Sequence, residues 1–153
     1  MRYLSFTLKE ESFGVSLEQV REVISFPEIS PVPGSSKKFL GITYLRNEIL
    51  PIVDLRITFG MTPTLSYDTA VIVCEVDSKP YGIVVDCIHN VITPESHELK
   101  PKNETEGIPE YIQQIVYREE KICLVLDVKS VLNTKELDLK KLLSSKEKIK
   151  TAS

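Results

Sequence analysis

Residues 41–60 read GITYLRNEILPIVDLRITFG, and this stretch carries the clearest signal for the fold. An apolar strand leads into a polar turn, a second apolar strand follows, and Asp54 opens a short helical turn. Two arginines, Arg46 and Arg56, sit beside strands that otherwise have the composition of a protein core. The stretch predicts β-structure and contains no catalytic signature.

Short, β-branched apolar runs of the same kind recur along the chain. Each is bounded by turn-forming residues, and no long helix separates them, which favours a mainly β fold built from small closed or partly closed barrels. The runs are Tyr3–Leu8, Phe13–Leu17, Val23–Phe26, Ile49–Val53, Val71–Val76, Ile83–Val85 and Ile122–Leu126. A single helical turn is expected between the second and third of them.

An internal repeat organises these runs. Residues 13–24 align without gaps with residues 81–92, a shift of 68 residues from 13 to 81. Residues 52–56 align with residues 125–129, a shift of 73 residues from 54 to 127. An insertion between the two blocks would explain the difference. We therefore expect two copies of one five-stranded unit, with chance similarity among apolar strands as the alternative.

The expected domain organisation follows from the repeat. We expect one domain over residues 1–144, with two interleaved subdomains at about 13–68 and 69–132 that can exchange strands at their ends. The proline-containing stretch Thr93–Pro109 is expected to be a long loop. A short amphipathic helix is expected near the C-terminus, followed by a flexible tail over residues 145–153. Its apolar residues are Leu137, Leu139, Leu142 and Leu143.

Composition excludes several classes of protein. The net charge is −3 and no Lys/Arg cluster precedes the tail, so the sequence lacks the basic footprint of a nucleic-acid-binding protein. No run approaches the ~18 apolar residues of a membrane span. The cysteines Cys74, Cys87 and Cys123 each lie in an apolar run, as buried thiols of a reducing cytosol do. We expect a cytoplasmic protein without direct membrane insertion.

Three aspartates follow apolar strands and raise the question of acid–base chemistry. Asp54 and Asp127 precede short helical segments, where a carboxylate accepts backbone N–H bonds, and we expect both to be N-caps. Together with Asp86 they could instead form a carboxylate site. Cys87 and His89 could share a metal in an extended segment, but two ligands do not make a site. The sequence predicts no metal and no cofactor.

The segment from Leu17 to Ile24 is the best candidate for a binding surface. Leu17, Val20, Val23 and Ile24 are more apolar side chains than one short strand-turn can bury on a single face. Either some are exposed and mark a partner site, or all four belong to the core. Glu22 and Arg56 could form an exposed ion pair, which would orient a partner while adding only ~0–1 kcal/mol of stability.

Several motifs in combination resemble those of the CheW family, whose members are scaffolds that couple bacterial and archaeal chemoreceptors to a histidine kinase. The resemblance extends over about Tyr3 to Asn133 and implies two five-stranded, SH3-like barrels packed side by side. This fold agrees with the repeat. The motifs are Phe13-Gly14, Val20–Val23, Val32–Gly34, Gly41–Arg56 and Gly82–Asp86.

The resemblance also implies partners. In the family, the groove between the barrels takes the cytoplasmic hairpin tip of a methyl-accepting chemoreceptor, and barrel faces contact the CheW-like regulatory domain of the kinase CheA. Tyr44 and Asn47 replace the Asn and Gly that the family commonly has, so a divergent partner is expected if Tyr44 touches one. The residues expected to bind partners are Leu17, Val20, Glu22, Ile24, Tyr44, Arg56 and Val91.

These observations predict a stand-alone, non-enzymatic chemotaxis adaptor. One alternative is a small β-barrel that binds a ligand, for which the three aspartates would have to converge on one pocket. The other is a barrel that binds single-stranded nucleic acid, which needs a basic groove with stacking aromatic residues. The chain has no Trp and is net acidic.

Overall fold

The computed structural model describes residues 1–104 and 106–133 of the 153-residue chain. Strands dominate the described part, together with two short α-helices, α1 (Leu55–Thr58) and α2 (Val128–Asn133). Single 3-10 turns are η1 (Leu17–Gln19), η2 (Ser96–Glu98) and η3 (Lys102–Glu104). The strands are β1 (Tyr3–Leu8), β2 (Glu11–Ser16), β3 (Val20–Ser25), β4 (Phe39–Leu45), β5 (Glu48–Asp54), β6 (Ala70–Val76), β7 (Lys79–Val85), β8 (Cys87–Ile92), β9 (Leu99–Lys100), β10 (Ile112–Arg118) and β11 (Lys121–Leu126).

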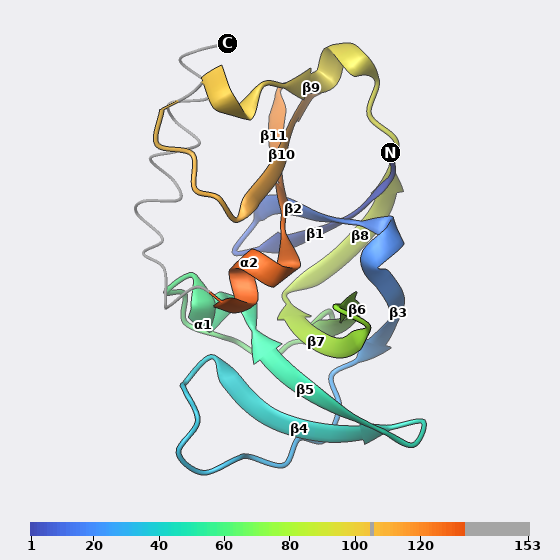
Figure 1. Cartoon of the computed structure of the whole chain (residues 1–153), viewed down its shortest axis with the longest axis vertical. Helices are drawn as coiled ribbons and strands as arrows, with labels where there is room; N and C mark the ends of the chain where they lie inside the picture. Colours follow the sequence, from blue (N-terminus) through green and yellow to red (C-terminus); the bar gives the residue numbers. More distant parts are fainter. Residues whose placement is uncertain (105, 134–153) are drawn as a thin grey trace.

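These strands form two sheets. The six-stranded sheet has the order β8-β1-β2-β11-β10-β9, and the five-stranded sheet has the order β3-β6-β7-β5-β4. The N-terminal hairpin therefore belongs to the sheet of the C-terminal strands, whereas residues 20–85 supply all strands of the other sheet. In Figure 1, β9, β10 and β11 lie at one end of the molecule, and β4 and β5 lie at the other end.

The strand registers agree with the sequence repeat. Each sheet contains one parallel pair, β2 with β11 and β5 with β7. Gly14 lies opposite Val125 in the first pair, and Gly82 lies opposite Ile52 in the second. The repeat equates these same positions, Gly14 with Gly82 and Ile52 with Val125. Both copies thus place the glycine strand beside the strand that leads into Asp54 or Asp127.

The main hydrophobic core lies between the two sheets. It joins side chains of the six-stranded sheet, such as Phe6 and Phe13, to side chains of the five-stranded sheet such as Ile72. Phe6, Phe13 and Phe59 are stacked with centroid distances of 6.0 and 5.8 Å, and Tyr111 adds a tilted contact to Phe59 at 5.7 Å. Burial of each such ring contributes about 1.5–3 kcal/mol, so this central cluster holds the sheets together.

A second cluster fills the other face of the five-stranded sheet. Phe26 and Ile29, between β3 and β4, fold over this face and pack against it together with Leu40 of β4. Gly41 permits the covering, because the Ser30 carbonyl oxygen lies 2.1 Å from the position that a Cβ at residue 41 would occupy. Its φ of +143° also favours glycine. The buried members of the cluster are Leu50, Ile52, Val71, Val73 and Val84.

Four two-residue hairpin turns share one unusual property. Both central residues have φ between +48° and +67° in each turn, as type I′ turns require, and none of these residues is glycine. Side chains other than those of Gly, Asn and Asp adopt this region at a cost of about 1–2 kcal/mol per residue. The turns are Lys9-Glu10, Arg46-Asn47, Asp77-Ser78 and Glu119-Glu120.

The predicted fold class is confirmed: the protein is mainly β, with two packed sheet subdomains and few helices. The sheets have six and five strands, and within the described residues hydrogen bonding does not close either into a barrel. The stretch Thr93–Pro109 contains η2, β9 and η3. The subdomain limits of 13–68 and 69–132 remain a prediction. The predicted C-terminal helix around Leu137–Leu143 and the tail lie outside the described residues.

Within residues 1–104 and 106–133, no helix has both the length and the apolar character that a membrane crossing requires.

Candidate functional site

The strand β3 is an edge of the five-stranded sheet and turns two valines toward the interior between the sheets. Val20 lies opposite Cys74, and Val23 lies opposite Ile72. Side chains of directly opposed residues share one face of an antiparallel pair, and Cys74 and Ile72 both belong to the central cluster. Val20 is half-buried against this cluster, whereas Val23 is 45% exposed.

The strand β8 is an edge of the six-stranded sheet and also turns a valine, Val91, toward the interior between the sheets. Val91 lies opposite Leu4, a member of the central cluster, yet Val91 is itself 45% exposed. Figure 1 shows β3 and β8 on the same flank of the molecule. We call Val20, Val23 and Val91 the valine edge, because here the apolar interior between the two sheets reaches the surface.

The two other apolar candidates occupy different surroundings. Leu17, in η1, packs half-buried against the central cluster, next to the valine edge in sequence. Ile24 lies opposite Val71 and packs against the second cluster, on the other face of β3. The segment from Leu17 to Ile24 is therefore divided between two faces, and only part of it is available to a partner.

Glu22 pairs with an arginine, but not with the one expected. Its carboxylate accepts a hydrogen bond from Arg46 Nη1 in the β4–β5 turn. The expected exposed pair between Glu22 and Arg56 is wrong, because the Arg56 guanidinium is buried and bound to Asp54 and Asp86. Glu22 lies opposite Val73, a member of the second cluster, so it occupies the face of β3 opposite to the valine edge.

A small charged hollow surrounds this pair. It has a volume of about 260 Å³ and is lined by residues of β3, the β4–β5 hairpin, β6 and β7. Arg21 bridges Glu48 at 2.9 Å and Glu75 at 3.3 Å across its mouth. These exposed pairs add little stability, since solvent screens them, but they fix the β4–β5 turn against β3.

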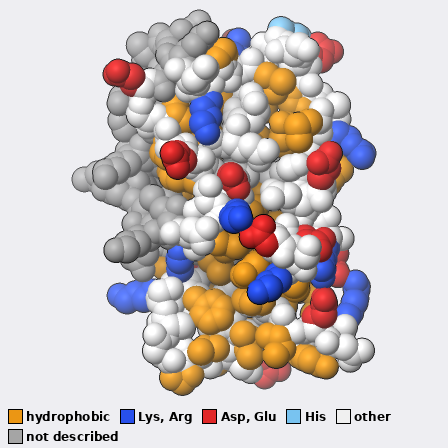
Figure 2. Space-filling model, viewed as in Figure 1, with side chains coloured by type: hydrophobic (Ala, Val, Ile, Leu, Met, Phe, Trp, Pro, Cys, Tyr) orange, Lys and Arg blue, Asp and Glu red, His pale blue; other side chains and the backbone are white. Residues whose placement is uncertain are grey.

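An exposed apolar strip covers the outer part of the β4–β5 ribbon. Tyr44 and Ile49 are directly opposite each other and are 69% and 60% exposed. Ile42 and Pro51 form the next pair on the same face of the ribbon and are half-buried. Figure 2 shows apolar side chains gathered at this end of the molecule. We call Ile42, Tyr44, Ile49 and Pro51 the ribbon face.

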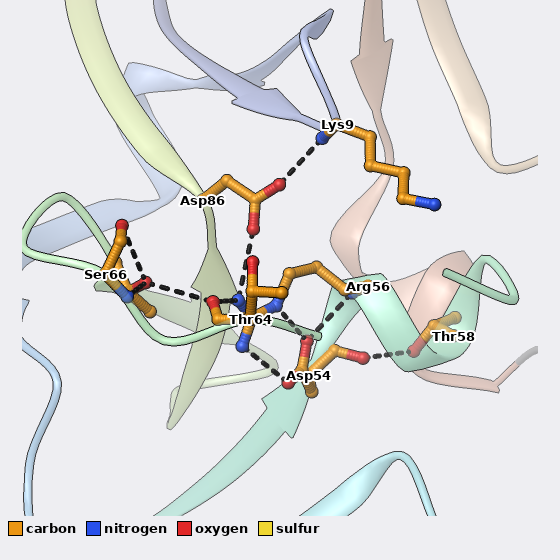
Figure 3. A network of polar contacts seen from close by, with 8 residues as sticks. Lys9, Asp54, Arg56, Thr58, Thr64, Ser66 and Asp86 are labelled. Carbon is orange, nitrogen blue, oxygen red and sulfur yellow. Dashed lines mark hydrogen bonds and ion pairs between the residues drawn. The ribbon is translucent and has the colours of Figure 1, made fainter. Parts of the chain in front are cut away.

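Arg56 lies at the centre of a buried polar network, drawn in Figure 3. Its Nε and Nη2 donate to the two carboxylate oxygens of Asp54, each at 3.0 Å. Its Nη1 donates to Asp86 at 3.1 Å and to the backbone carbonyl of Thr64. Burial lowers the pKa of Arg56, but the hydrogen bonds and charges of both aspartates outweigh burial and leave this pKa above its ordinary value.

The expected N-caps are present. Asp54 accepts a hydrogen bond from the backbone N–H of Arg56 at 2.9 Å, and Asp127 accepts one from the N–H of Ser130 at 3.4 Å. Asp54 and Asp86 do converge, as a carboxylate site would require, but they converge on the Arg56 guanidinium. Asp127 caps a different helix. The three carboxylates therefore act as structural hydrogen-bond acceptors.

The candidate metal ligands Cys87 and His89 also make other contacts. Cys87 donates weakly to the Ile88 carbonyl oxygen, and His89 lies 3.3 Å from the Thr7 hydroxyl. In the described part of the chain, no three His, Cys, Asp or Glu side chains are grouped as a metal site would need. Cys74 and Cys123 are buried, as expected, and Cys87 is half-buried.

Sequence reasoning missed several residues of the candidate surfaces, among them Arg46 and Ile49. Arg46 was visible as a charged residue beside an apolar strand, but only the bulge and register of β3 bring Glu22 to it. Ile49 had the composition of a core strand, but it lies on the face of β5 opposite to the buried Leu50 and is exposed there. The structure places Arg56 in the interior, where it does not line either apolar surface.

The fold and these surfaces define a class of protein: a small β scaffold with two separate apolar surfaces and its buried charges used for structure. Residues 2–136 match the sequence profile of the CheW-like domain, and the chain belongs to this family. The membership supports a role as a chemotaxis scaffold and favours neither the ligand-binding nor the nucleic-acid-binding alternative.

Individual relatives agree with the family assignment. The chain is 29% identical over 141 residues to the chemotaxis protein CheW of Klebsiella aerogenes, covering 90% of this chain and 84% of that protein. It is 28% identical over 141 residues to the chemotaxis protein CheW of Treponema pallidum, covering 88% and 83%. The crystal structure of the scaffolding protein TtCheW from Thermoanaerobacter tengcongensis superposes with a TM-score of 0.78 at 26% identity, covering 89% and 96%.

Proposed function

We propose that this protein is a non-enzymatic adaptor that joins the cytoplasmic hairpin tip of a chemoreceptor to the regulatory domain of the kinase CheA. It would act in the cytoplasm, recruited to membrane-bound receptor arrays. The observation that carries the proposal is the valine edge, where apolar side chains of both sheets are exposed within a fold of the CheW-like family. An amphipathic helix can lay its apolar face against such a surface.

The two apolar surfaces suggest that each binds a different partner. We assign the receptor tip to the valine edge, and the kinase regulatory domain to the ribbon face around Tyr44 and Ile49. Glu22 and Arg46 fix the β4–β5 turn between these surfaces and would set the register of a partner there. Contacts of this size give affinities in the micromolar range, about −8 kcal/mol.

The test is a Val23→Lys variant titrated with a soluble receptor hairpin tip. Val23 is 45% exposed, so a lysine can be accommodated without disrupting the fold, but its charge would be buried by an apolar partner surface. We expect the affinity to fall by at least about tenfold, or 1.4 kcal/mol. Val20→Lys should also abolish binding, but Val20 packs against the core and that variant needs a stability check.

Val32→Lys is the matched control, because Val32 is 38% exposed and lies outside both apolar surfaces. It should bind the hairpin tip normally. If Val23→Lys and Val91→Lys both bound as tightly as the unmodified protein, the assignment of the receptor to the valine edge would be wrong.

A further inference from the structure

One of the places where the chain crosses between the two sheets is held by a single carboxylate. The chain leaves the five-stranded sheet at Val85, the end of β7, and enters the six-stranded sheet at Cys87, the start of β8. Asp86 is the single residue between them. Whatever fixes Asp86 therefore also fixes the direction in which β8 departs from the five-stranded sheet.

Asp86 is bound from both sheets at once. From the five-stranded sheet, Arg56 Nη1 donates to its Oδ1 at 3.1 Å. From the six-stranded sheet, the backbone N–H of Lys9 in the β1–β2 turn donates to its Oδ2 at 2.7 Å, and the Asp86 N–H donates to the Thr7 carbonyl at 3.1 Å. Figure 3 shows the carboxylate between Lys9 and Arg56. We call Lys9, Asp54, Arg56 and Asp86 the junction network.

Arg56 is itself held rigidly. Its side chain is 4% exposed, and the bidentate pair with Asp54 fixes the plane of its guanidinium. Burying this charge costs several kcal/mol in desolvation, which its ion pairs only roughly repay, so well-packed apolar side chains in place of the whole network would serve stability equally well. The network is better explained by geometric specificity, which directional charged hydrogen bonds supply.

The rest of the contact between the two halves is mostly apolar, apart from the exposed Asp77–Lys129 pair and the hydrogen bond from Lys38 Nζ to the Leu132 carbonyl. Hydrophobic contact is non-directional, so the central cluster resists separation of the sheets more strongly than it resists a small rotation or slide between them. The junction network adds the missing directional constraint. It acts at the base of β8, whose other end carries Val91.

We propose that Arg56 and Asp86 are positioning residues for partner binding: they fix the angle between the two sheets and so place Val91 relative to Val20 and Val23. The proposal rests on the proposed function of the valine edge. Val91 lies five residues beyond Asp86, about 15 Å along the strand, so a turn of about 10° at Asp86 displaces Val91 by about 3 Å. Arg56 would thus influence binding without touching the partner.

Asp86→Asn is the direct test, because it keeps the shape of the side chain and removes the charge that Arg56 binds. Asp77→Asn is the matched control, since Asp77 lies in a β-turn and forms an exposed ion pair with Lys129 at 3.0 Å. Two measurements are made on each protein: residual dipolar couplings of the backbone N–H groups in both sheets, and titration with a soluble receptor hairpin tip.

In Asp86→Asn we expect the dipolar couplings of each sheet to agree with the structure of that sheet taken alone. The two sets of couplings should nevertheless require different alignment tensors, because the angle between the sheets has changed. The affinity for the hairpin tip should fall by about tenfold, within the range of couplings that pass through packed networks. Asp77→Asn should change neither quantity. Should Asp86→Asn fail to fold, Arg56→Lys replaces it, because lysine keeps the charge but cannot bind both aspartates through a planar fork.

One common alignment tensor in the variant, equal to that of the unmodified protein, would overturn the proposal, whether or not binding changed. An altered tensor with unchanged affinity would overturn the link to partner binding. If the unmodified protein failed to bind the hairpin tip, the proposed function would fail instead, and the dipolar couplings would still decide whether the junction network orients the sheets.

Discussion

At the scale of single residues, equivalent positions in the two repeats have acquired different environments. Asp54 and Asp127 are equated by the repeat, and both cap a short helix. Asp54 is nevertheless 1% exposed and paired with a buried arginine, whereas Asp127 is half-buried. The second residues of the two helices, Arg56 and Lys129, also differ in burial. Arg56 forms a buried pair with Asp54, whereas Lys129 forms an exposed pair with Asp77.

This difference predicts unequal costs of removing the two aspartates. Asp127→Ala should lower the free energy of unfolding by about 1 kcal/mol, the usual value for an N-cap. Asp54→Ala should cost about 3–5 kcal/mol, because it leaves a buried guanidinium without its bidentate partner. Urea unfolding measures both. Asp54→Asn is the control that keeps an N-cap while removing the ion pair, and equal costs for the two alanine variants would contradict the buried pair.

At the scale of elements, the hairpins carry strain in their turns. Glu119 and Glu120, between β10 and β11, both have φ in the left-handed region, at 51° and 63°. The turn geometry is imposed by the right-handed twist of the strands, which type I′ turns match. The strands thus decide the turn conformation, and the residues that occupy the turn adapt to it at a cost.

Replacing Glu119-Glu120 by Asn-Gly should therefore stabilise the protein by about 1 kcal/mol or more, because both new residues adopt the left-handed region readily. The free energy of unfolding in urea is the quantity to compare. A Gln-Gln variant removes the same two charges while leaving the strain in place, and it should remain close to the original stability. A similar gain in both variants would point to charge repulsion in place of backbone strain.

At the scale of the whole molecule, the central cluster couples stability to pH. Burial raises the pKa of the Cys74 thiol from 9.0 to about 12, and it raises the pKa of the Tyr111 phenol from 10.0 to about 12. Both groups stay protonated in the folded protein at pH values where the unfolded chain releases its protons. Their contribution is fully present below about pH 9 and is lost as the pH rises toward 12.

The free energy of unfolding should accordingly fall above pH 9. Cys74 alone lowers it by about 1.4 kcal/mol per pH unit once the thiol of the unfolded chain has ionised. Urea unfolding at pH 9.5 and 10.5 under reducing conditions, about one unit apart, tests this slope. Cys74→Ala lowers stability at every pH through the cavity it leaves, but it should flatten the slope by about that amount. A slope unchanged in Cys74→Ala would show that the thiol is not the titrating group.

The sequence by itself determined the kind of structure and its internal repeat. Alternating and β-branched apolar runs specify strands locally, and the repeat predicted which strands are equivalent, as the registers Gly14–Val125 and Gly82–Ile52 show. The N-caps at Asp54 and Asp127 were equally predictable, because capping depends only on neighbours in the chain. The family followed from the same motifs.

Only the tertiary structure decided which side chains meet and which remain exposed. Glu22 pairs with Arg46 because the bulge and register of β3 bring it to the β4–β5 turn. Arg56 is enclosed by Asp54 and Asp86 because the chain crosses between the sheets at Asp86. Local sequence patterns encode neither arrangement. Val23 and Ile49 have core-like neighbours in sequence, yet they are exposed, whereas Leu50, next to Ile49 on the opposite face of β5, is buried in the second cluster. The exposure of a side chain depends on what packs over its face of the sheet, and that is a property of the whole fold.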